Sequence, residues 1–94
     1  MTKLTRSSLE EAEVIALKGL AFLASDPERL SRFLTLSGMS PDDLRAAAAD
    51  RHFLAGVLNH LLQDESLLLT FTAGEDLDPR LAAQAVEILN EFQR

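Results

Sequence analysis

Leucine, alanine and phenylalanine recur along the chain at intervals of three and four residues, the spacing that places side chains on one face of an α-helix. The pattern is clearest in the segment 51–63, whose apolar stripe consists of Phe53, Leu54, Val57, Leu58, Leu61 and Leu62. In the same segment His52, Gly56 and Asn59 fall on the opposite face. We predict that this segment is the central helix of the fold.

The first and last apolar segments follow the same rule. The segment 8–24 carries a stripe of Leu9, Ala12, Ala16, Leu20 and Leu23. The segment 79–92 carries Leu81, Ala85, Ile88 and Phe92 beside Ala82 and Leu89. Both segments are therefore predicted to be helices that pack through one face.

Short polar signals mark where the helices begin and end. A capping side chain precedes a proline at three places: Asp26-Pro27, Ser40-Pro41 and Asp78-Pro79. Asp50 and Asp64 are two further predicted helix starts. The capping oxygen accepts a backbone N–H of the first turn, and proline fits the first helical position because it has no N–H to satisfy. Gly38 and Gly74 stand where a left-handed residue would end a helix. The predicted helices are 8–24, 27–37, 41–49, 51–63, 65–73 and 79–92.

The composition indicates an all-α fold. The chain holds three Val and two Ile against 19 Leu and 13 Ala, and no segment alternates apolar and polar residues for long. Connections between the predicted helices are short, so we expect a compact array of five to six short helices. Residues 1–94 are predicted to form a single domain, with residues 1–7 as a disordered N-terminal tail.

Charge and cysteine content remove several classes of function. With 9 Lys and Arg against 15 Asp and Glu, the net charge is -6 at pH 7, and there is no cysteine. Thiolate zinc sites, iron–sulfur clusters and cysteine nucleophiles are therefore excluded. No apolar run is long enough for a signal peptide or a membrane span. We expect a cytoplasmic protein that does not bind membranes.

Three apolar residues do not fit the predicted stripes. Ile15 and Phe22 lie well away from the stripe of the first helix, and Leu69 points away from the other apolar residues of the segment 65–73. One explanation is that neighbouring helices cover a short helix on two sides. The other is that these residues form a surface for self-association or for a protein partner.

The sequence offers little catalytic chemistry. His52 and His60 are about two helical turns apart, roughly 12 Å, which is too far to share a metal ion. His60 and Asp64 could meet across a helix boundary as a base and its carboxylate, but no nucleophile motif accompanies them. We expect no cofactor and no metal, and a small enzyme is the least favoured class.

A helix-turn-helix motif is a second alternative, because residues 32–45 contain two predicted helices joined by a short turn with a glycine. The helix after Ser40 begins with Pro41, Asp42 and Asp43 and offers only Arg45 as a basic residue. A helix that reads DNA needs several basic and amide side chains. Binding to nucleic acid is therefore not expected.

The stretch Arg32 to Met39, followed by Pro41, Leu44-Arg45, Phe53-Leu54, Val57-Leu58, Leu61, Glu65 and Phe71, resembles a bacterial family of small helical proteins described only as a domain of unknown function. The resemblance implies a single helical domain and carries no activity or cofactor. Arg45 and Glu65 are its polar positions of interest. They either form an ion pair or a helix cap that holds the fold, or they recognise a partner.

These observations favour a non-enzymatic protein-interaction or regulatory module. An apolar helical face edged by carboxylates would bind a second copy of the chain, as a homodimer, or a basic amphipathic helix of another protein.

Overall fold

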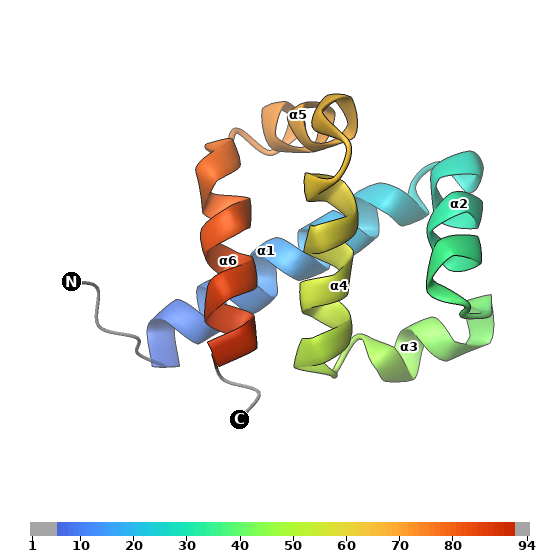
Figure 1. Ribbon diagram of the computed structural model, residues 1–94, viewed down its shortest axis with the longest axis horizontal. Helices are drawn as coiled ribbons and strands as arrows, with labels where there is room; N and C mark the ends of the chain where they lie inside the picture. Colours follow the sequence, from blue (N-terminus) through green and yellow to red (C-terminus); the bar gives the residue numbers. More distant parts are fainter. Residues whose placement is uncertain (1–5, 92–94) are drawn as a thin grey trace.

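Figure 1 shows the computed structural model, which describes residues 6–91 as helices joined by short turns. In chain order the elements are α1 (Arg6–Ala24), α2 (Pro27–Ser37), the 3-10 turn η1 (Pro41–Asp43), α3 (Leu44–Ala47), α4 (Arg51–Leu62), α5 (Glu65–Gly74) and α6 (Pro79–Glu91). The described residues contain no strand, so the all-α prediction is confirmed. Of the expected N-terminal tail, residues 1–5 lie outside the described part of the chain, while Arg6 and Ser7 belong to α1.

The predicted capping residues begin the helices. The Asp26 carboxylate accepts the backbone N–H groups of Glu28 and Arg29, which starts α2. Asp64 accepts the N–H of Leu67 at 3.1 Å and so caps α5. Asp50 and Asp78 cap the helices that follow them in the same manner. These contacts span two or three residues, and this short range is why the sequence alone located them.

Two local predictions need correction. The segment 41–49 forms only the turn η1 and the four-residue α3, because it has no buried residue that would hold a longer helix against the core. Gly38 ends α2 with φ 71°, as predicted, but Gly74 is the last residue of α5. The left-handed residue of that turn is Asp76, with φ 55°. Aspartate tolerates this conformation better than most residues, so no glycine is required there.

The core lies where α1, α4 and α6 meet. Figure 1 shows α1 crossing behind α4 and α6, which stand side by side. Gly19 allows α1 to approach α4 closely, because a Cβ at this position would be 3.0 Å from the Leu61 side chain. The largest fully buried side chains are Phe71, Leu23, Leu54, Leu58, Leu61, Leu89 and Val57. Four of them, Leu54, Val57, Leu58 and Leu61, belong to the stripe predicted for residues 51–63, which confirms that this face of α4 is buried in the core.

Aromatic contacts attach the outer helices to this core. Phe33 is the buried residue of α2, and its ring lies 5.9 Å from that of Phe53 and 5.1 Å from that of His60 on α4. The Phe71 ring of α5 lies 5.5 Å from the Phe22 ring of α1. Helix α2 therefore stands at the edge of the molecule, held mainly at one side, with its other faces free to line surface hollows.

Candidate functional site

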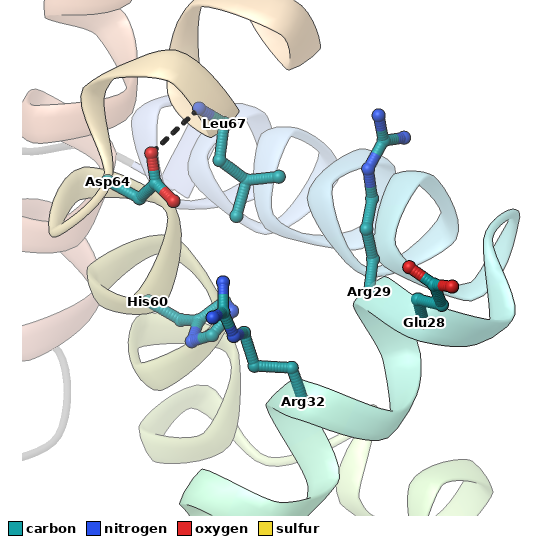
Figure 2. Close-up of a pocket in the computed structure, with 6 residues that line it drawn as sticks. All are labelled: Glu28, Arg29, Arg32, His60, Asp64 and Leu67. Carbon is teal, nitrogen blue, oxygen red and sulfur yellow. Dashed lines mark hydrogen bonds between the residues drawn. The ribbon is translucent and has the colours of Figure 1, made fainter.

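A cleft of about 340 Å³ opens between α2 and the turn that joins α4 to α5. Its lining combines charged, aromatic and apolar side chains from three elements: Glu28, Arg29, Arg32, His60, Asp64 and Leu67. Figure 2 shows Arg29 and Arg32 extending from α2 on one side, with Asp64 and Leu67 on the other. The volume lies at the lower end of the range for small-molecule sites.

The two arginines occupy one face of α2 because they are three residues apart. The Arg29 guanidinium lies 4.5 Å from the centre of the Phe22 ring, a cation–π contact that leaves the N–H groups at its edge available. Among the described residues, neither Arg29 nor Arg32 forms an ion pair. The cleft lining thus contains two arginine side chains that form no ion pair with a carboxylate among the described residues.

Opposite charges act on His60 from the two sides of the cleft. Partial burial and the Arg32 charge lower the pKa of His60 below its ordinary value of 6.5, and the Asp64 charge acts in the opposite direction. The imidazole is therefore neutral at pH 7. No hydrogen bond joins His60 to Asp64 in the described part of the chain; an Asp64 oxygen instead accepts the Leu67 N–H. The Asp64 carboxylate thus caps α5.

The opposite face of α2 borders a second hollow, of about 620 Å³. Successive turns of α2 and the connection to η1 line it: Pro27, Leu30, Ser31, Leu34, Thr35, Gly38, Met39 and Pro41. At 100° per residue, Leu30 and Leu34 lie far around the helix from Arg32. We call this hollow the α2–η1 groove. Its side chains are mostly apolar, in contrast to the charged cleft.

The three residues expected to form a partner surface have different surroundings. Leu69 is 47% exposed on α5. Ile15 is partly buried, facing Leu81 and Ile88 of α6, and Phe22 is partly buried against Phe71. Their role in partner binding stays a prediction.

The two polar positions of the resemblance, Arg45 and Glu65, are both exposed, and no ion pair joins them within the described residues. Glu65 lies in the first turn of α5, where its negative charge favours the helix. Arg45 lies on the four-residue α3, which offers one basic group. Arg51, which follows, lies 3.5 Å from the Glu13 carboxylate. This arrangement does not test the helix-turn-helix alternative, which stays a prediction.

Within the described residues, no group of three or more metal-ligating side chains is close enough to hold a metal ion. None of the described helices has the length and hydropathy needed to cross a membrane.

Comparison with protein families matches residues 9–91 to a family described as a protein of unknown function, DUF3572. The chain belongs to this family. The match includes all the residues on which the resemblance to a family of unknown function depended, so that resemblance is confirmed. No curated protein and no solved structure matches the chain. The DUF3572 description assigns no activity, and a function for this member has to be argued from its own geometry.

The sequence analysis singled out His60 and Asp64 but missed the other residues of the cleft: Glu28, Arg29, Arg32 and Leu67. The available signal was two arginines three residues apart on an amphipathic helix. Such pairs of arginines are common on exposed helices. Only the packing of α2 beside the α4–α5 turn places these two in the lining of a cleft.

Proposed function

We propose that this DUF3572 member is a cytoplasmic, non-enzymatic protein-interaction module whose α2–η1 groove binds a basic amphipathic helix of a partner protein. The observation that carries the proposal is an apolar groove whose lining residues Pro27 and Pro41 are next to acidic residues in the chain. Such a groove has the shape and chemistry of the helix-in-groove mode of recognition, in which a partner inserts apolar side chains spaced by three and four residues.

The floor of the groove supports this assignment. Leu30 and Leu34 are partly exposed one turn apart, and Met39 faces the same hollow from the chain beyond Gly38. Apolar groups left open to water in a row gain free energy when another apolar surface covers them. Ser31 and Thr35 add hydroxyl groups along one side, where they can pair with polar groups of a bound helix.

The charges around the groove support a basic partner. Asp26 precedes Pro27 at one end, and Asp42 and Asp43 follow Pro41 at the other. Hydrogen bonds from the Ser40 backbone N–H and hydroxyl lower the pKa of Asp43, so this carboxylate stays ionised well into the acid range. A second copy of the chain carries a net charge of -6 and is a poorer electrostatic match than a helix rich in lysine.

A designed peptide tests the proposal directly. The probe is a fluorescently labelled helix of leucine and lysine with leucines spaced by three and four residues, and the matched control peptide has glutamate in place of lysine. Fluorescence anisotropy measures binding to the whole chain. We expect saturable binding of the lysine peptide and at least tenfold weaker binding of the glutamate peptide, about 1.4 kcal/mol.

Variants on two faces of α2 separate groove binding from general attraction between charges. Leu34→Asp should weaken binding of the lysine peptide at least about tenfold, the loss typical of an interface anchor. Leu36→Asp is the matched control, because Leu36 is 71% exposed and does not line the groove. Thr35→Arg should likewise weaken binding of the lysine peptide. Thr35 lines the groove at an exposed position, so this substitution does not put folding at risk. Circular dichroism confirms that each variant is folded.

The outcomes are distinct. Attraction between charges alone would make both aspartate variants bind the lysine peptide more tightly, and this result would overturn the proposal. Equal binding of the two peptides would also overturn it. Sedimentation equilibrium of the unliganded chain tests whether a second copy of the chain occupies the groove. A dimer that is dissociated by Leu34→Asp but not by Leu36→Asp would assign the groove to that second copy instead.

A further inference from the structure

The charged groups of the cleft between α2 and the α4–α5 turn are separated rather than paired. Figure 2 shows Arg32 reaching from α2 toward His60, while Asp64 lies across the cleft at the start of α5. Arg32 and Asp64 are both near enough to His60 to act on its charge, in opposite directions. They nevertheless form no ion pair with each other in the described structure. A cation and an anion therefore face the same open space from opposite walls.

The balance of charge in the lining narrows the class of ligand. Two arginines and two carboxylates line the cleft, and His60 is neutral at pH 7, so the lining has no net charge. A dianion such as inorganic phosphate would meet the arginines but would also be repelled by Asp64 and Glu28. A small molecule that carries one negative and one positive group matches both walls at once.

Leu67 supplies the apolar part of the site. Its side chain is partly buried and lines the cleft beside Asp64. An aliphatic group that contacts Leu67 would be removed from water at the same time as the two charged groups are bound. The Phe33 ring packs edge-to-face with the imidazole of His60, with the ring centroids 5.1 Å apart, and this contact helps to hold His60 in the cleft lining.

We propose that this cleft binds a small zwitterion, namely a free α-amino acid with an aliphatic side chain. Arg32 binds the carboxylate, and Asp64 binds the ammonium group. The neutral His60 offers a ring nitrogen as a further hydrogen-bond partner. The site lies on the opposite face of α2 from the α2–η1 groove, so the inference does not depend on the proposed function.

The probe is L-leucine, added to the isotope-labelled full chain and followed by two-dimensional NMR of the backbone amides. We expect saturable shifts confined to residues 28–32, 60 and 64–67, with a Kd of about 1 mM or tighter. Two analogues each lack one charge: 4-methylpentanoate has no ammonium group, and L-leucine methyl ester has no carboxylate. Each analogue should bind at least about tenfold more weakly than L-leucine, a difference of about 1.4 kcal/mol.

Two conservative variants test the two walls. Arg32→Gln removes the positive charge, and Asp64→Asn removes the negative charge while keeping a side chain that caps α5 well. Each should weaken L-leucine binding at least about tenfold, about 1.4 kcal/mol. Arg45→Gln is the matched control, since Arg45 is an exposed arginine on α3 outside the cleft lining, and it should leave binding unchanged.

If L-leucine does not bind with a Kd of about 1 mM or tighter, the inference is overturned. Equal binding of either analogue would also overturn it, as would equal effects of Arg32→Gln and Arg45→Gln. Leu34→Asp, which tests the α2–η1 groove, should leave L-leucine binding unchanged, so failure at one site is distinguishable from failure at the other.

Discussion

Gly19 and Gly56 form a matched pair for testing how closely α1 approaches α4. Replacing a glycine within a helix by alanine gains about 1 kcal/mol of stability, because alanine has less backbone freedom to lose on folding. At Gly56 a new Cβ would meet nothing within 4 Å beyond its own helix backbone and chain neighbours. We therefore expect Gly56→Ala to stabilise the fold by about 1 kcal/mol.

At Gly19 the same substitution meets the core. The new Cβ would lie 3.0 Å from Leu61 Cδ1 and 3.5 Å from Val57 Cγ1, and both of these side chains are 0% exposed. Overpacking of a core costs about 1–3 kcal/mol, which offsets or exceeds the helix gain of about 1 kcal/mol. Gly19→Ala should therefore leave stability unchanged or reduce it by up to about 2 kcal/mol.

Urea and thermal unfolding followed by far-ultraviolet circular dichroism measure both variants, since the chain has no Trp or Tyr and is largely helical. For a domain of this size, a gain of 1 kcal/mol raises the midpoint of thermal unfolding by about 4–8 °C. The two variants should differ by about 1–3 kcal/mol. Equal shifts in the same direction would refute the close approach of α1 to α4 at Gly19.

Three further predictions concern the end of α2 and the titrating groups. Gly38→Ala should destabilise the fold by about 1 kcal/mol in urea unfolding, because φ of 71° strains a residue with a Cβ. The lowered pKa of His60 means that the unfolded chain binds the proton more readily, so stability present above about pH 6.5 is lost as the pH falls. Arg32→Gln should raise the pKa of His60 in an NMR titration and reduce this loss; an unchanged pKa would contradict the placement of Arg32. Hydrogen bonds from Arg80 lower the pKa of Asp78 from 3.8 to about 2, so its contribution to stability is present above pH 3.8 and is lost toward pH 2. Asp78→Asn should make the midpoint of thermal unfolding less dependent on pH between pH 3.8 and about pH 2. An unchanged pH dependence would contradict the hydrogen bonds between Arg80 and Asp78.

The sequence predicted the elements well where the signal was local. The caps at Asp26, Asp64 and Asp78 bind backbone groups two or three residues away, so they work in the same way in any tertiary context. The stripe of residues 51–63 likewise predicted the buried face of α4, because its period is set by helix geometry. The prediction that Gly74 adopts a left-handed conformation was wrong, because Gly74 remains within α5 and Asp76 adopts that conformation in the following turn.

The candidate site could be predicted only in part. His60 and Asp64 were identifiable because they lie four residues apart in the chain. Arg32 reaches them from a different helix, and its position depends on the packing of Phe33 against the His60 ring. A contact between elements distant in the chain leaves no periodic signal in a single sequence.

By itself, the sequence determined that this chain is all-helical and where most of its helices begin, because capping and helical periodicity act over a few neighbouring residues. Only the tertiary structure decided that Phe22 packs on Phe71, that Leu69 stays exposed, and that α2 separates a charged cleft from an apolar groove. These outcomes depend on which helix faces cover one another. Which faces cover one another depends on the combined burial of side chains from all the helices, so it cannot be read from any single segment.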